Sequence, residues 1–305
     1  MLREGRLNVM HKKRNYWKME LRWFSFVLPA LFFYLVFFLA PTLSSTYYSL
    51  TDWDGITNKF IGLSNFKEMF HDRMILSSFR NTAMYTIFIT LLQNVIGLLA
   101  ALILVKKFAG VNAMRTMIFM PYIFSTLLIG YVWGFMLEPN IGVVNNVLDA
   151  LHLNQLKLGW LSDPSVARWM IILVTVWQCM GYSMVIYIAG LQGISKELYE
   201  SGDIEGASKL QRFWHITFPL IAPAFTINII LCLIGDLQLF NQIYALTGGG
   251  PGYATESIAT MIYQVGFGTG IRWGYGSALS VTLFVSILFI TILMVTFLRK
   301  REVEM

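Results

Sequence analysis

The chain has 305 residues, of which 56% are hydrophobic and 13% are charged. A soluble globular protein carries about 25% charged residues, so this composition excludes an ordinary soluble domain and indicates an integral membrane protein. The net charge is +6 at pH 7. The lysines and arginines fall in short loops and tails and form no nucleic-acid-binding motif, so we expect the lipid bilayer as a partner and no nucleic acid.

The N-terminal segment joins a basic tail to an apolar run. Residues 1–22 include seven lysines and arginines, and residues 23–40 carry no charge. The run is longer than the core of a signal peptide, and Pro41 follows directly on the one suitable small-residue cleavage site. We therefore expect residues 1–22 to be a cytoplasmic tail and residues 23–42 to be an uncleaved first span.

Five more apolar segments follow, which predicts an all-α fold, a polytopic membrane protein with six transmembrane helices. The transmembrane domain covers residues 23–298, and residues 299–305 form a second short cytoplasmic tail. The third span contains Pro121, which frees a backbone carbonyl, so we expect this span to be kinked. The five spans are expected at about residues 79–105, 114–137, 167–191, 216–246 and 277–298.

The positions of the basic residues predict the orientation of the spans. Six spans place both termini on one side, and sixteen of the 23 lysines and arginines would lie on that side. Because cytoplasmic segments carry the excess of positive charge, we expect both termini to be cytoplasmic. The same count places residues 193–215 in the cytoplasm.

Residues 193–215 are the longest polar interruption between two apolar spans in the second half of the chain. Ser195 can cap a helix there. Gly202 and Gly206 lie four residues apart, so we expect them to share one helix face and to form a shallow notch. A second helical stretch is expected at residues 208–216.

This loop resembles the cytoplasmic loop of bacterial ABC-importer permeases. The family pattern is Glu-Ala-Ala, three residues, Gly, nine residues, Ile, any residue and Leu-Pro. The chain reads Glu200-Ser201-Gly202, then Gly206, then Ile216-Thr217-Phe218-Pro219, so it departs at the two alanines and the leucine. In that family the loop is a coupling helix that docks into a cleft on an ATPase subunit. The resemblance implies an ATPase-coupling role for Glu200, Ser201, Gly202, Glu205, Gly206, Ala207, Ile216 and Pro219.

The resemblance extends over roughly residues 20–300. Residues 47–50 and 60–66 look like the first outer loop of carbohydrate ABC-importer permeases, and residues 246–256 are typical of the same group. It implies a permease in the bacterial inner membrane that pairs with a second homologous permease, two ATPase subunits and an extracellular or periplasmic sugar-binding protein. It also implies that ATP and magnesium bind to the ATPase, and that this chain binds no cofactor.

Other classes of function have weaker support in the sequence. Residues 247–252 are glycine-rich but lack the lysine of a nucleotide-binding loop, which favours a turn or a lid over a pore mouth. The chain contains neither a His-Glu-x-x-His motif nor a pair of intramembrane carboxylates, so the sequence gives no sign of a membrane-embedded enzyme. A stand-alone secondary sugar carrier or channel stays an alternative, although it would have Asp236 as its one clear intramembrane ionisable group. A non-transporting scaffold is not excluded.

The fourth span carries a candidate face for a sugar, which presents hydroxyl groups and apolar ring faces. Trp177, Met180, Gly181 and Met184 follow the spacing of one helix face. This face resembles the segment that lines the sugar site in maltose-transporter permeases. Plain helix packing is the alternative for these four residues.

The fifth span carries Asp236, with Leu239 and Phe240 on the same face and Gln238 beside them. A lone carboxylate in a span costs about 2.5 kcal/mol or more unless it faces water or a partner. We expect Asp236 to face the translocation path, with a structural hydrogen bond to another span as the alternative. An oligosaccharide is the preferred substrate, because an anion such as glycerol phosphate would be repelled by Asp236.

Overall fold

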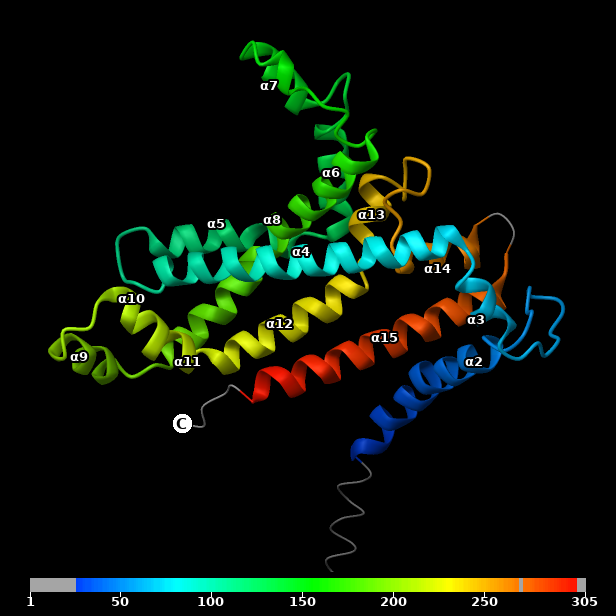
Figure 1. The fold of residues 1–305 in the computed structure, drawn as a ribbon, viewed down its shortest axis with the longest axis horizontal. Coiled ribbons are helices and arrows are strands. Elements are labelled where there is room, and N and C mark those ends of the chain that lie inside the picture. The colour runs from blue at the N-terminus through cyan, green and yellow to red at the C-terminus, as the bar shows by residue number, and fades with distance from the viewer. Residues whose placement is uncertain (1–25, 269–270, 301–305) are drawn as a thin grey trace, which may run out of the picture.

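The computed structural model describes residues 26–268 and 271–300, which fold into helices joined by loops (Figure 1). Residues 1–22, the first residues of the first span and the end of the C-terminal tail lie outside the described residues. The helices are η1 (Leu35–Leu39, π-helical), α2 (Ala40–Tyr48), α3 (Ser64–Met69), α4 (Arg73–Leu104), α5 (Val111–Ile123), α6 (Thr126–Met136), α7 (Val143–Ala150), η2 (Asn154–Leu156, 3₁₀), α8 (Pro164–Gln192), α9 (Lys196–Ile204), α10 (Lys209–Arg212), η3 (Phe213–Thr217, π-helical), α11 (Phe218–Leu220), α12 (Ala222–Leu237), α13 (Asn241–Leu246), α14 (Ile258–Phe267) and α15 (Trp273–Arg299).

Within the described residues, four helical segments are long and apolar enough to cross a membrane, and two bent helix pairs raise this number to six. The straight segments are Phe26–Tyr48, α4, α8 and α15. The bent pairs are α5 with α6, at 94°, and Lys209–Leu220 with α12, at 66°. The predicted all-α polytopic fold is therefore confirmed, and two of its spans are divided.

Helices α4 and α8 begin several residues before the predicted spans, because each has an aspartate cap. The Asp72 carboxylate accepts hydrogen bonds from the backbone N–H groups of Met74 and Ile75, at 2.8 and 3.4 Å. Asp163 caps α8 in the same way, and Pro164 occupies its first position. Such caps satisfy N–H groups that have no partner within the helix, so polar first turns extend the apolar spans.

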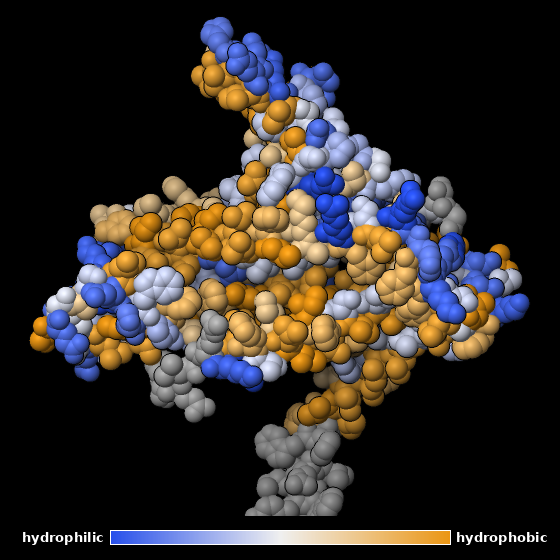
Figure 2. Space-filling model, viewed as in Figure 1, coloured by the Kyte–Doolittle hydropathy of each residue, from blue (hydrophilic) through white to orange (hydrophobic). Residues whose placement is uncertain are grey.

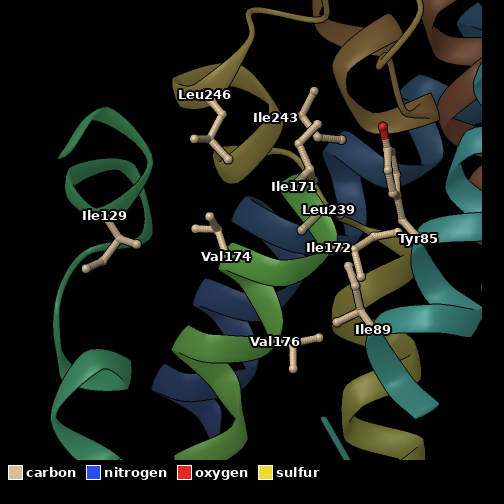
Figure 3. Close-up of a cluster of buried hydrophobic side chains, with 10 residues drawn as sticks. All are labelled: Tyr85, Ile89, Ile129, Ile171, Ile172, Val174, Val176, Leu239, Ile243 and Leu246. Atoms are coloured by element: carbon tan, nitrogen blue, oxygen red, sulfur yellow. The ribbon is translucent and has the colours of Figure 1, made fainter. Parts of the chain in front are cut away.

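Helices α4 and α8 lie side by side with their N-terminal ends together. Near those ends, Tyr85 and Ile89 of α4 pack with Ile171 and Ile172 of α8 in one buried cluster (Figure 3). A second cluster joins the C-terminal end of α4 to the end of α8 that leads into α9, through residues that include Leu104 and Leu191. We call this end of the bundle the α9 end.

Small residues bring neighbouring helices into close contact. A Cβ atom added at Gly97 of α4 would lie 2.6 Å from Cβ of Ser183 on α8. One added at Gly181 of α8 would lie 2.7 Å from Cα of Phe119 on α5. Close backbone approach at small residues is typical of helix packing in membranes, where dispersion contacts take the place of the hydrophobic effect.

The third span is broken beyond its proline. Pro121 lies inside α5, and the 94° bend follows at Phe124 and Ser125, whose backbone is extended. The sequence predicted a kink caused by Pro121, whereas the structure places the break at the next two non-helical residues.

The fifth span, expected as one helix over residues 216–246, is divided twice. A bend at Ile221 follows a π-helical turn and Pro219. A second break separates α12, which ends at Leu237, from α13, which begins at Asn241. Because proline lacks an N–H group and crowds the preceding turn, a bend near Pro219 has a direct cause in the sequence.

The surface agrees with a bilayer environment. On the face drawn in Figure 2, apolar side chains cover most of the length of the bundle, and hydrophilic side chains gather at its two ends and on the arm that carries α7. At the end opposite α9, both guanidinium nitrogens of Arg272 contact the Glu68 carboxylate, at 2.6 and 2.7 Å. This pairing lowers the pKa of Glu68 and connects α3 to the residue before α15.

Candidate functional site

A cavity of about 200 Å³ lies among the central helices. It is bounded by residues of α4, α5, α6, α8, α12 and α13, so it lies where the two broken spans meet the two straight ones. Its lining combines polar groups, tyrosines and sulfur atoms: Gln93, Tyr122, Thr126, Thr175, Cys179, Tyr182, Leu231, Cys232, Gly235, Asp236, Leu239 and Gln242.

Asp236 supplies the carboxylate of this cavity. The residue is 6% exposed, and one carboxylate oxygen accepts a hydrogen bond of 2.7 Å from the Thr90 hydroxyl of α4. None of the ion pairs found among the described residues involves Asp236. The side chain therefore keeps acceptor capacity for a donor such as a sugar hydroxyl.

Two tyrosines form an aromatic surface in the same cavity. The rings of Tyr122 on α5 and Tyr182 on α8 stack with centroids 4.8 Å apart and an interplanar angle of 21°. The side of the cavity that α8 contributes consists of Thr175, Cys179 and Tyr182. An aromatic surface beside polar acceptors is the combination that a sugar ring requires.

A buried polar network continues from the cavity toward the α9 end. The Gln93 amide donates to the Ser183 hydroxyl at 3.0 Å and contacts the sulfur of Cys232 at 2.9 Å. The side-chain amide oxygen of the next residue, Asn94, accepts hydrogen bonds from the Tyr187 hydroxyl and the Asn228 amide, which lie one turn from Ser183 and Cys232 on their helices. Interhelical hydrogen bonds of this kind hold α4, α8 and α12 in register.

The sequence-predicted sugar residues fall into two groups. Asp236 and Leu239 line the cavity, whereas Gln238 and Phe240 lie outside its lining in the segment between α12 and α13. The Phe240 ring stacks on Tyr244, with centroids 5.3 Å apart. Whether any of these residues binds a sugar stays a prediction.

The predicted face of α8 lies in helix contacts rather than in the cavity lining. Trp177 meets Trp133 of α6 edge to face at 5.6 Å, and Gly181 lies against the backbone of α5. Met184 is completely buried in the cluster at the α9 end. Met180 has its backbone carbonyl beside Gly97.

Gln178 connects the breaks in the two divided spans. Its amide nitrogen donates to the carbonyl of Phe124, at the break between α5 and α6, at 3.2 Å. Its amide oxygen accepts from Gln242 of α13, beyond the break after α12, at 2.8 Å. The backbone carbonyl released at the first break thus has a side-chain partner, as irregular backbone within a membrane requires, whereas the bond to Gln242 joins two side chains.

The sequence contained a signal for these residues that the helix-face reasoning missed. Gln93, Asn94, Gln178 and Asn228 are amides inside long apolar runs, and polar side chains in such runs face the bundle interior. The spacing of apolar residues alone does not distinguish this interior face from a packing face.

The glycine-rich segment at residues 247–252 is held on the end of the bundle opposite α9. The Asn81 amide of α4 donates to the backbone carbonyls of Ala254 and Glu256, at 2.9 Å in both cases. The Tyr85 hydroxyl donates to the Thr255 carbonyl at 3.0 Å. Residues 254–256, directly after the glycine-rich segment, are thus fastened to α4, in part by Tyr85 of the buried cluster in Figure 3.

The second candidate site is the short helix α9, which lies at the opposite end from this segment (Figure 1). The Ser195 hydroxyl caps it by accepting from the Glu197 N–H group. At its C-terminal end, Gly206 has a φ of 75°, and Ala207 N–H donates to the Gly202 carbonyl at 2.9 Å. This glycine-terminated helix end is a Schellman motif, which requires the left-handed conformation at Gly206.

The expected notch is not formed by both glycines. Helix α9 ends at Ile204, so Gly206 lies beyond it and does not share a helix face with Gly202. Gly202 is buried, and a Cβ atom there would lie 3.2 Å from Ile216 and 3.3 Å from Arg212. Gly202 therefore serves a close contact between α9 and the segment that leads into α12.

Three contacts fasten α9 to α10 and η3. Arg212 forms an ion pair with Asp203 and packs against Gly202. The hydroxyls of Tyr199 and Thr217 are hydrogen-bonded at 3.0 Å. Tyr199 also packs on the buried cluster at the α9 end. Side-chain contacts, in addition to the polypeptide backbone, therefore attach α9 to the N-terminal part of the fifth span.

The free side of this region is exposed. Ile204 is 88% exposed and Leu210 is 68% exposed, with Trp214 exposed beside them. Of the coupling residues expected from the sequence, Gly202 is buried and Ala207, Ile216 and Pro219 are half-buried in the attachment. The other four are exposed: Glu200, Ser201, Glu205 and Gly206.

Comparisons with known proteins agree on one family. Residues 93–303 match the family model described as "Binding-protein-dependent transport system inner membrane component". A probable starch degradation products transport system permease protein of Thermoanaerobacterium thermosulfurigenes is 37% identical over 297 residues, which cover 97% of this chain and 100% of that protein. The trehalose/maltose transport system permease protein of Thermococcus litoralis is 34% identical, with 87% of this chain and 90% of that protein covered.

The fold is also similar to a solved structure. A chain of a bacterial ABC transporter involved in the import of the acidic polysaccharide alginate superposes with a TM-score of 0.82 at 24% identity. The match covers 94% of this chain and 99% of that chain. At this identity the likeness concerns the fold.

Replacing Gln178 with alanine tests its role at the helix breaks. The change leaves the Phe124 carbonyl and the Gln242 amide without their partner, which costs about 1–3 kcal/mol for each buried unsatisfied group. We expect a lower midpoint of thermal unfolding in detergent. Thr175→Val on the same helix is the control, because the Thr175 hydroxyl donates only to its own helix, at Ile171. An equal midpoint for both variants would contradict the role assigned to Gln178.

Proposed function

The chain belongs to the family of binding-protein-dependent transport system inner membrane components, and we propose that it forms half of the translocation pathway of an ATP-driven ABC importer for an oligosaccharide. Members of this family are transport permeases and not enzymes. The chain is accordingly a multi-pass protein of the inner membrane, with several helices long enough to span it.

The observation that carries the proposal is the attachment of α9. A short helix with exposed apolar side chains is fastened to the base of a span whose other end bears Asp236. In our proposal α9 lies in the cytoplasm and docks on an ATPase subunit, which binds ATP and magnesium. Both termini then lie in the cytoplasm, and two ATPase subunits serve this chain and a second homologous permease.

The size of the cavity supports a pathway shared between two permeases. Sites for small molecules usually measure about 300–1,000 Å³, and this cavity holds about 200 Å³. A second permease facing Asp236 would complete the site. The printed names of the relatives, which mention starch degradation products and trehalose/maltose, support an oligosaccharide delivered by an extracellular or periplasmic sugar-binding protein.

Ile204 provides a test of the docking helix. Replacing this exposed apolar side chain with glutamate would bury a charge in the proposed contact, so we expect Ile204→Glu to lose at least tenfold in the amount of ATPase that copurifies. The matched control is Ile56→Glu, because Ile56 is 93% exposed in the loop before α3. Equal ATPase recovery with both variants would contradict docking through α9.

Asp236→Asn tests the proposed contact with the sugar. The amide oxygen can still accept from Thr90, but the second oxygen is replaced by an NH2 group that cannot accept, so a hydrogen bond from a sugar hydroxyl, which contributes about 1 kcal/mol, is lost. In proteoliposomes that contain the whole assembly, we expect the sugar concentration that gives half-maximal uptake to rise about fivefold. Asp149→Asn, on the α7 arm, is the control, since Asp149 pairs with Lys157 far from the cavity.

The same proteoliposomes separate this function from a stand-alone carrier or channel. An importer takes up sugar only with ATP, the ATPase and the binding protein. Uptake by the purified chain alone under an ion gradient would favour the alternative function.

A further inference from the structure

A second cavity, of about 290 Å³, lies between the N-terminal turns of α4 and α8. These turns are at the end of the bundle opposite α9, since the C-terminal ends of both helices pack together beside α9. Two arginines, Arg80 of α4 and Arg168 of α8, line this cavity. It is separate from the cavity around Asp236, with which it shares no lining residue.

The charge of these arginines is not neutralised by a close ion pair. None of the ion pairs among residues 26–268 and 271–300 involves Arg80 or Arg168. Arg168 makes two long hydrogen bonds, both 3.4 Å, to the Ala254 carbonyl and the Ser165 hydroxyl. Asp163 lies close enough to Arg168 for a Coulombic interaction but forms no ion pair with it, and its Oδ1 atom accepts hydrogen bonds from the backbone N–H groups that it caps.

The remainder of the lining divides into a polar and an apolar part. Hydroxyl groups of Ser77 and Ser165 accompany the arginines, whereas Met84, Phe88 and Trp169 supply the apolar part. The rings of Phe88 and Trp169 meet edge to face at 4.9 Å, and Trp169 is 41% exposed. An amphipathic cavity with two guanidinium groups matches a ligand that has an anionic group joined to an apolar chain.

The depth of the cavity in the bilayer follows from helix length. At 1.5 Å per residue, the 32 residues of α4 and the 29 of α8 measure about 48 and 44 Å. The hydrocarbon core is about 30 Å thick, so roughly the first nine or more residues of each helix extend beyond it if the other ends stop near its boundary. Arg80 and Arg168 are the eighth and fifth residues of their helices. Both therefore lie in the headgroup layer, and Trp169 beside them is typical of the membrane interface.

We propose that this cavity binds the headgroup of an anionic phospholipid from the leaflet opposite α9. The two guanidinium groups hold the phosphate, and Met84, Phe88 and Trp169 contact the start of the acyl chains. Because the Asn81 amide and Arg168 both contact the Ala254 carbonyl, the bound lipid would lie against the support of the glycine-rich turn. The proposal requires insertion in the membrane, and it does not depend on the sugar or on the ATPase.

The test is a titration of the purified permease assembly in detergent with phosphatidylglycerol or phosphatidylcholine, followed by native mass spectrometry. We expect the first phosphatidylglycerol to bind at least tenfold more tightly than phosphatidylcholine. The double variant Arg80→Gln/Arg168→Gln should lose this preference and keep its weak binding of phosphatidylcholine. The matched control is Arg73→Gln/Lys59→Gln, which removes two positive charges from the same end of the protein but none from the cavity lining.

Three outcomes would overturn the proposal. The first is an unchanged preference in the double variant, and the second is an equal loss in the control, which would indicate general charge attraction. The third is competition by free sn-glycerol phosphate at the same concentration as the lipid, which would indicate a site for a soluble anion. If the double variant does not fold, Arg80→Lys gives the same test, because it keeps the charge but loses the two-pronged contact with phosphate. It should weaken phosphatidylglycerol binding several-fold, and wild-type affinity would contradict the site.

Discussion

The close contact at Gly202 is the constraint on which the proposed mechanism depends. With no side chain at this position, α9 lies directly against Arg212 and Ile216, and the Asp203–Arg212 and Tyr199–Thr217 contacts form around it. A larger residue would separate the two segments and weaken both contacts. Because these segments continue into α12, we propose that a displacement of α9 is transmitted to the helix that carries Asp236. The proposed docking helix and the cavity would then be two parts of one structural unit, although they lie at different depths in the bundle.

A second physical requirement shapes the centre of the molecule. Breaks in the third and fifth spans interrupt the helical hydrogen bonds inside the bundle, so the backbone groups released there need partners from neighbouring helices or from water in a cavity. From the unbroken helix α8, the Gln178 side chain donates to the Phe124 carbonyl at the first break and accepts from the Gln242 side chain of α13, beyond the second break. The amides of Gln93, Asn94 and Asn228 form the remaining polar contacts between α4, α8 and α12. The bundle therefore joins straight helices to broken ones through side-chain hydrogen bonds donated in both directions, and the cavity lies where the two kinds meet.

Much of this arrangement could be predicted from the sequence, and the exceptions have physical reasons. Apolar runs and charges predicted the spans, and the loop pattern predicted the family. The helix that contains Gly202 was expected, but its end at Ile204 was not. Gly206, four residues after Gly202, is compatible with either a shared helix face or a Schellman motif. The sequence predicted the distortion of the third span at Pro121, whereas the break lies at Phe124 and Ser125. Extended backbone at two such residues has no signature in the amino-acid composition. On α8, periodicity identified a face with Trp177 and Met184, which packs against other helices, whereas Thr175, Cys179 and Tyr182 line the cavity. Which face of α8 borders the cavity depends on the positions of α5 and α6, which the sequence of α8 does not specify.

The claim that α9 and α12 move as one body can be measured directly. Spin labels at Lys196 of α9 and Ile227 of α12, both exposed positions outside the proposed docking contact, would report their separation in the reconstituted assembly by pulsed electron spin resonance. Cys179 and Cys232 would be replaced by alanine, and retained uptake would show that the labelled assembly still works. We expect the same distance distribution with and without ATP. A distribution that shifts on addition of ATP, with α9 leaving its contact at Gly202, would contradict the account.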